Sequence, residues 1–107
     1  MTNPFAGEVA LVLNGERKVL KLTLGALAEL EDALGAGSLL ELVERFEYGR
    51  YSVRDVLALI LAGLRGGGWT GDAAMLAGAE ISGGPIEAAR VAAQLLARAF
   101  AMPEAKQ

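Results

Sequence analysis

The sequence predicts an α+β fold in which one β-hairpin, over residues 7–22, precedes about five short helices. The hairpin is indicated by Asn14-Gly15, which stands between two apolar-rich runs and suits a two-residue turn that needs positive φ at both positions. After the hairpin, apolar residues recur at the three-to-four-residue spacing that is typical of helices. One hairpin followed by helices therefore predicts the α+β class.

The two faces of the hairpin are both apolar. Val9, Leu11 and Leu13 alternate onto one face, and Ala10 and Val12 occupy the other. An isolated hairpin is only marginally stable in water, so other elements must cover it.

Capping residues and glycines mark the helices that follow. Thr23 is a cap for the first of them, and Ser38 with Glu41 and Ser52 with Asp55 have capping-box spacing. Thr70 is the expected cap of a short helix, and Pro85 occupies a favoured first helical position in the last one. The helices are expected over residues 24–34, 38–46, 53–64, 72–80 and 85–101.

Two of these helices carry more apolar surface than a small domain buries easily. Residues 56–64 include no polar side chain, which is typical of a helix that is buried in a core or covered by a partner. The last helix has one narrow polar stripe, formed by Glu87, Arg90, Gln94 and Arg98. This excess of apolar surface predicts a binding or assembly protein that is able to self-associate as a homo-oligomer.

The composition removes several classes of function. The 107 residues include no cysteine and no histidine, so a disulfide scaffold, a thiolate metal site and histidine chemistry are excluded. The formal net charge of −3 gives no reason to expect nucleic acid as a partner. We expect one domain over residues 7–103, flexible termini at 1–6 and 104–107, no signal peptide, no membrane span and a cytoplasmic location.

The glycine loop at residues 63–72 contains the pattern G-x-G-x-x-G at Gly66, Gly68 and Gly71. A dinucleotide site needs a strand before these glycines, whereas here a helix precedes them, and the lysine of a phosphate-binding loop is missing. We therefore interpret the loop as a helix end followed by a turn. The serines have no histidine to activate them, so neither catalysis nor a cofactor is expected.

Acidic residues gather on the first two expected helices. They are Glu29, Glu31, Asp32, Glu41, Glu44 and Glu47. Their spacing does not complete a metal site, so a solvated acidic face is predicted.

Trp69, the single tryptophan, is able to anchor a partner or to pack over the core, and we favour packing.

Three segments carry a resemblance to a known family. They are "LKLTLGALAELEDALG" (20–35), "RDVLALILAGLRGGGW" (54–69) and "VAAQLLARAFAMP" (91–103). With the order of the elements, they resemble the tail protein family of gene transfer agents, the phage-like particles of α-proteobacteria. The resemblance covers about residues 7–103, and its motifs are structural rather than catalytic.

The resemblance implies a non-enzymatic role in building a phage-like tail. One possibility is a tail assembly chaperone that binds the tape-measure protein and the tail tube subunit, and the alternative is a structural component of the tail tube, located in the particle. The single hairpin favours the chaperone, because a tube ring needs long strands. Independently of the resemblance, the excess apolar surface suggests four partner-binding positions near the glycine loop and the last helix, expected to be exposed: Leu64, Trp69, Leu95 and Phe100.

Overall fold

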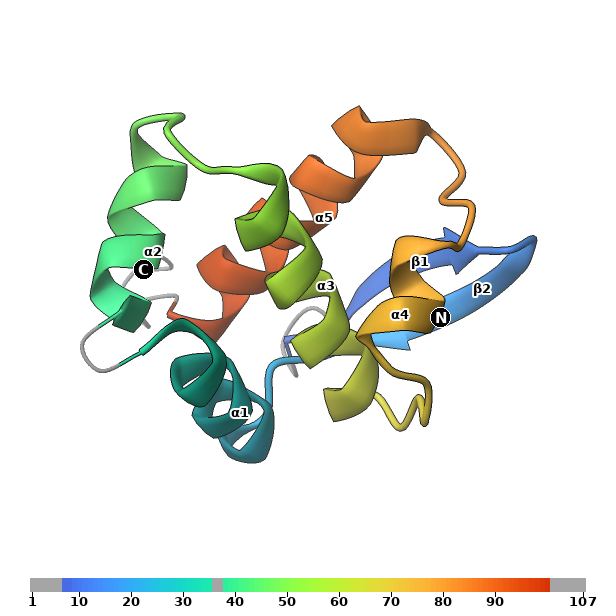
Figure 1. The fold of residues 1–107 in the computed structure, drawn as a ribbon, viewed down its shortest axis with the longest axis horizontal. Coiled ribbons are helices and arrows are strands. Elements are labelled where there is room, and N and C mark those ends of the chain that lie inside the picture. Colours follow the sequence, from blue (N-terminus) through green and yellow to red (C-terminus); the bar gives the residue numbers. More distant parts are fainter. Residues whose placement is uncertain (1–6, 36–37, 101–107) are drawn as a thin grey trace, which may run out of the picture.

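The computed structural model describes residues 7–35 and 38–100, which fold into the predicted hairpin and five helices (Figure 1). The strands are β1 (Val9–Leu13) and β2 (Glu16–Leu20), and the helices are α1 (Leu24–Leu34), α2 (Ser38–Glu47), α3 (Val53–Gly66), α4 (Ala73–Ala77) and α5 (Gly84–Ala99). This order confirms the α+β class. The termini that we expected to be flexible lie outside the described residues.

The hairpin has the predicted turn. β1 and β2 pair antiparallel from Val9 opposite Leu20 to Leu13 opposite Glu16. Asn14 and Gly15 have φ angles of 52° and 81°, as a type I′ turn requires at both positions. The Val9 face of β1 is buried, and the face that carries Ala10 and Val12 is half-buried, so other elements do cover both faces.

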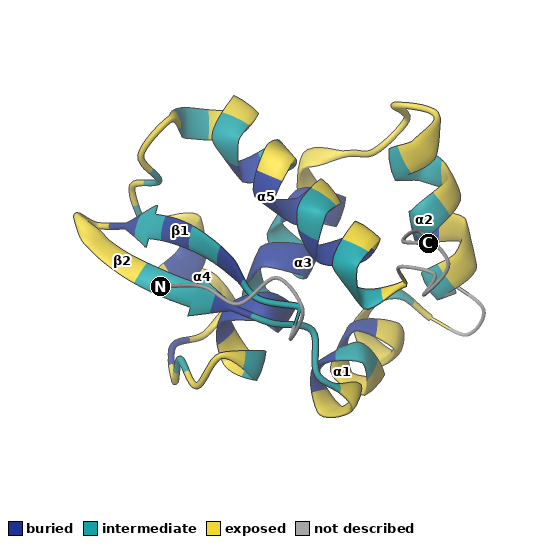
Figure 2. Cartoon of the chain, turned by 180° about the vertical axis from the view of Figure 1, so that it is seen from behind, coloured by how far each residue is buried: buried dark blue, intermediate teal, exposed yellow. Residues whose placement is uncertain are grey.

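Helix α3 forms the centre of the molecule, with α1 and α2 on one side, the hairpin on the other and α5 behind it (Figure 1). Its residues Leu59 and Ile60 are fully buried, and so is Val91 of α5, which packs against it. Figure 2, seen from behind, shows this buried centre and the more exposed α2. The interpretation of residues 56–64 as a buried helix is therefore confirmed, except that Leu57, Ala58 and Leu61 remain half-buried on the outer face.

The caps explain where two of the helices begin. The backbone N–H of Ala26 donates to Oγ1 of Thr23 at 3.0 Å, which confirms the cap of α1. Ser52 and Asp55 form the complete capping box of α3, with each side chain accepting from the other residue's backbone N–H. The side chain of Ser38 lies outside the described part of the chain, so the cap predicted there is not tested.

Helix α4 is shorter than the predicted range of 72–80, and its cap is different. Oδ1 of Asp72 accepts from the backbone N–H of Met75 at 2.9 Å, so Asp72 rather than Thr70 is the cap. The helix ends at Ala77 because the chain then turns at Gly78 toward the hairpin. The last helix also differs slightly from the range predicted for it, since α5 begins at Gly84 and ends at Ala99.

Residues 80–82 lie beside the turn end of β1, where Ile81 forms an isolated β-bridge with Leu13, instead of extending α4. The backbone N–H of Asn14 donates to the carbonyl of Glu80 at 2.8 Å, and that of Ser82 donates to the carbonyl of Val12 at 3.1 Å. On the other side of the sheet, the backbone N–H of Lys21 donates to the carbonyl of Gly63 in α3 at 3.0 Å. The fold therefore holds the hairpin at the turn end of β1, through Val12 and Asn14, and directly after β2, through Lys21.

Candidate protein-binding groove

The glycine loop is built for close packing. A Cβ atom on Gly66 would lie 1.9 Å from the carbonyl oxygen of Lys21, and one on Gly67 would lie 1.9 Å from that of Val19. Such distances are far inside van der Waals contact, so the last turn of α3 reaches the edge of β2 only because both residues lack a side chain.

The remaining glycines of the pattern also have structural roles. Gly68 has a φ angle of +103°, which favours glycine, and a Cβ on Gly71 would lie 2.2 Å from the ring of Trp69. The Trp69 ring is half-buried and packs against the core, as we favoured. The pattern is therefore explained by packing and turn geometry, without reference to a nucleotide.

The structure places the four candidate partner-binding residues in different environments. Leu64 is 1% exposed and Leu95 is 0% exposed, so both belong to the core and the expectation that they are exposed was wrong. They are buried because the elements around α3 cover the inner faces of α3 and α5 completely. Trp69 is half-buried, and Phe100 is 43% exposed.

Sequence reasoning missed the large apolar side chains that are most exposed. Val53 is 75% exposed and Ile86 is 85% exposed, and Leu24 is similarly open to solvent. Each lies in the first turn of its helix, beyond the part that packs on the core. The signal that could have found Leu24 and Val53 is their position directly after the capping residues Thr23 and Ser52.

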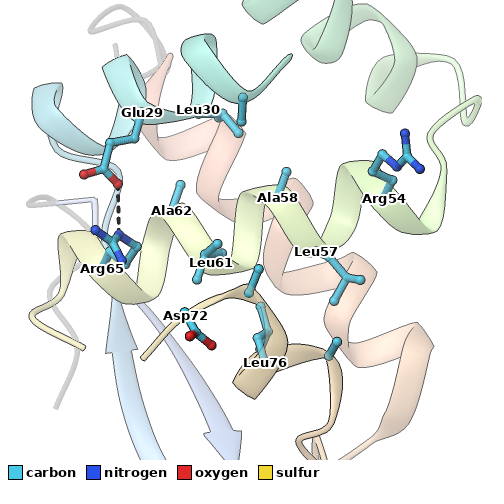
Figure 3. Close-up of a pocket in the computed structure, with 13 residues that line it drawn as sticks. Glu29, Leu30, Arg54, Leu57, Ala58, Leu61, Ala62, Arg65, Asp72 and Leu76 are labelled. Atoms are coloured by element: carbon cyan, nitrogen blue, oxygen red, sulfur yellow. Dashed lines mark hydrogen bonds and ion pairs between the residues drawn. The ribbon is translucent and has the colours of Figure 1, made fainter. Parts of the chain in front are cut away.

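A groove of about 530 Å³ runs along the outer face of α3, and we call it the α3 groove. Its floor is formed by Leu57, Ala58, Leu61 and Ala62 of α3. Its walls come from Leu30 and Ala33 of α1 and from Ala73, Leu76 and Ala77 of α4. Figure 3 shows α1 and α4 on opposite sides of α3, with the labelled apolar side chains between them. The surface inside the groove is therefore mainly that of alanine and leucine side chains.

A second hollow of about 790 Å³ continues the groove beyond Leu57, which lines both. It lies between the first turns of α3 and α5, and Val53 and Ile86 are among the residues that line it. Apolar surface therefore extends from the C-terminal half of α3 past its N-terminus. Contiguous apolar surface of this kind on a small protein is typical of a site for another protein.

The charged residues at the α3 groove lie at its margins. At one end, Nε of Arg65 donates to Oε1 of Glu29 at 3.0 Å, an ion pair that joins α3 to α1 (Figure 3). The carboxylate of Asp72 caps α4. Arg54 lies at the opposite end of α3 in Figure 3, and no hydrogen bond or ion pair of its side chain occurs within residues 7–35 and 38–100.

The carboxylates of α1, α2 and α3 either face solvent or form hydrogen bonds that stabilise the fold. The acidic residues of α1 and α2 are all exposed, which confirms the predicted acidic face. Asp55 is buried, and its oxygens accept hydrogen bonds from Arg45 and from the backbone N–H of Ser52. Within residues 7–35 and 38–100, no cluster of three acidic side chains is placed to hold a metal ion, and no helix is long and apolar enough to cross a membrane.

A comparison with known protein families matches nearly the whole chain. A model of the family described as "Phage tail tube protein, GTA-gp10" matches residues 6–102. The description names the gene transfer agent tail that the three sequence segments indicated, and it agrees better with a structural tail tube component than with an assembly chaperone. Searches of the curated proteins and of the solved structures gave no match.

Proposed function

Because the chain belongs to the gene transfer agent tail family described as phage tail tube protein GTA-gp10, we propose that it helps to build a phage-like tail by binding other tail proteins, without catalysis. The α3 groove supports this role, because it presents apolar surface in a hollow between three helices. The half-buried Leu57 and Leu61 in its floor would lose their remaining contact with water when a partner covers them.

Within this role, the geometry favours a tail assembly chaperone, whose partners would be the tape-measure protein and the tail tube subunit. The observation that carries this proposal is the state of the hairpin edges. Residues 80–82 bond to the hairpin at Val12 and Asn14, and the C-terminal turn of α3 packs against Val19 of β2 and against Lys21, which follows it. A subunit that joins a tube wall by strand pairing needs an unpaired edge to offer to its neighbour. Short, covered strands suit a protein that binds through helices.

The second candidate is a structural component of the tail tube. The family description favours it, since that description names a tube protein. In this function the exposed apolar side chains at Val53 and Ile86 would be covered by neighbouring subunits in the particle rather than by a transient partner. The two candidates place the protein in different locations, the chaperone in the cytoplasm and the tube component in the particle.

Quantitative mass spectrometry distinguishes the chaperone from the structural tube component. It compares the amount of this protein in purified particles with the amount in the cytoplasm of the producing cells. A chaperone is expected in the cytoplasm and absent from finished particles, in which the tube subunit serves as the internal standard. A copy number equal to that of the tube subunit would establish the structural role and reject the chaperone. Failure of a tagged full-length chain to co-purify with the tape-measure or tube protein would reject both.

A further inference from the structure

We propose that the α3 groove binds one amphipathic helix of another tail protein, and that this helix carries an acidic side chain opposite Arg54. The inference rests on the proposed function, in which the chain binds other tail proteins. It adds the kind of segment that is bound, the surface that binds it and the residue that sets its orientation.

The walls of the groove decide which backbone conformation fits. The floor and both walls belong to helices, α3, α1 and α4, whose backbone N–H and C=O groups bond along their own axes. An extended segment in this apolar groove would lose water from its backbone groups without gaining partners, which is costly. A helix satisfies its own backbone groups, so it is the conformation that the groove accepts.

The dimensions and side chains of the groove also suit a helix. The α3 residues that line the groove run from Arg54 to Arg65, which is about 16 Å at 1.5 Å per residue, or three helical turns. Both walls are lined partly by alanine, as at Ala33 and Ala77. Small side chains let the axes of two helices approach to the usual distance of about 8 to 10 Å.

The charge at the groove fixes the chemistry of the partner. Glu29 and Arg65 pair with each other at one end, and the exposed, negatively charged Asp72 accepts the capping bond of α4 through one oxygen. Within residues 7–35 and 38–100, Arg54 is then the lining cation that lacks a partner side chain. An acidic residue of the bound helix would pair with it, and a single charge pair at one end of an apolar groove determines the direction in which a helix binds.

The test uses the full chain in producing cells. Photo-crosslinking residues replace Ala33 and Ala77 in the groove, and Ala97 on α5 is replaced in the same way as a control. Ala97 is exposed and does not line the groove. Crosslinks from the two groove positions are expected to fall on one segment of the tape-measure or tube protein, at three-to-four-residue spacing, with an acidic residue near the end that lies over Arg54.

A charge exchange then tests Arg54 itself. With the purified chain and the identified partner, Arg54→Glu is expected to weaken binding at least about fivefold, because an attraction becomes a repulsion. Reversing the acidic residue of the partner to lysine is expected to restore binding to Arg54→Glu. The matched control is Arg17→Glu, the same charge change at an exposed position of the hairpin, which is expected to leave binding unchanged.

The outcomes separate this inference from the proposed function. If the chain co-purifies with tail proteins but crosslinks only from Ala97, the function stands and the groove is not the site. Crosslinks from the groove to a second copy of this chain, or to a segment with the two-residue spacing of a strand, would overturn the proposed occupant. An equal loss of binding in Arg54→Glu and Arg17→Glu would overturn the specific pairing. If no tail protein co-purifies, both proposals fail.

Discussion

Arg45 and Asp55 form a bidentate ion pair that connects α2 to the first turn of α3. Nε of Arg45 donates to Oδ2 of Asp55 at 2.9 Å, and a second guanidinium nitrogen donates to Oδ1 at 3.0 Å. The carboxylate is buried and also belongs to the capping box with Ser52. Beside it, the rings of Phe46 and Tyr51 stack with centroids 4.4 Å apart. One polar and one aromatic contact therefore fix the loop between the two helices.

Replacing this carboxylate should destabilise the whole domain. Asp55→Ala removes the ion pair and the capping box together, and we expect a loss of about 2 to 3 kcal/mol in the free energy of unfolding. For a chain of this size, each kcal/mol lowers the melting temperature by roughly 4 to 8 °C, which circular dichroism measures. Asp32→Ala, at an exposed position of α1, is the matched control and should change stability by less than about 0.5 kcal/mol. Equal effects of the two substitutions would contradict this account.

The same carboxylate predicts how stability depends on pH. Burial raises the pKa of Asp55, but the hydrogen bonds and charge of Arg45 and the hydrogen bonds from Ser52 lower it by more, so the pKa lies below its ordinary value. Because the folded pKa is lower than the unfolded one, the stabilisation is complete above the unfolded value of about 4 and is lost as the pH falls through the folded value.

Urea unfolding at pH 7 and at pH 3 measures this loss. Asp55→Asn should be less stable than the native chain at pH 7 and should lose less stability on acidification. Some loss should remain in this variant, because the hydrogen bonds from Arg90 also lower the pKa of Glu87. Parallel pH profiles for the native chain and Asp55→Asn would show that Asp55 does not carry the effect.

The local signals in the sequence predicted most of the fold. Thr23, Ser52 and the Asn14-Gly15 turn determine where elements begin or reverse through bonds within a few residues, so a sequence pattern can predict them. The short segment at residues 80–82 was missed because its partners, Asn14 and Val12, lie far away in the sequence. Pairing of that kind depends on how the whole chain packs.

The binding surface was harder to predict for a related reason. Residues 56–64 are apolar on every side, so the sequence gives no indication of which side faces the core. The structure buries Leu64 and leaves Leu57 and Leu61 facing the groove. That choice is made by the placement of α1, α4 and the hairpin around α3, which apolar periodicity does not encode.

The glycine loop predicts a sharp contrast between two glycine-to-alanine changes. Gly66→Ala places a Cβ against the carbonyl of Lys21 and should cost at least about 2 kcal/mol, because the last turn of α3 must move away from β2. Gly25→Ala, in α1, meets nothing closer than Oγ1 of Thr23 at 3.8 Å, and should stabilise the domain by about 0.5 kcal/mol. Thermal unfolding of both variants is the measurement. A neutral Gly66→Ala would mean that close packing does not explain this glycine.

The burial of Leu64 and Leu95 predicts that these residues act on stability rather than directly on binding. Leu64→Ala and Leu95→Ala should each cost about 2 to 5 kcal/mol, the usual range for removing a buried leucine side chain. Leu24→Ala is the matched control, because the same atoms are removed from an exposed position, and it should change stability little.

The two core variants should bind the partner about as well as the native chain does. Binding is measured at a temperature where circular dichroism shows that the variants are folded. Neither side chain reaches the surface where a partner would touch it. Loss of binding in a variant that is still folded would mean that Leu64 or Leu95 shapes the binding surface from below. In that case the α3 groove would depend on the core beneath it as well as on the side chains that line it.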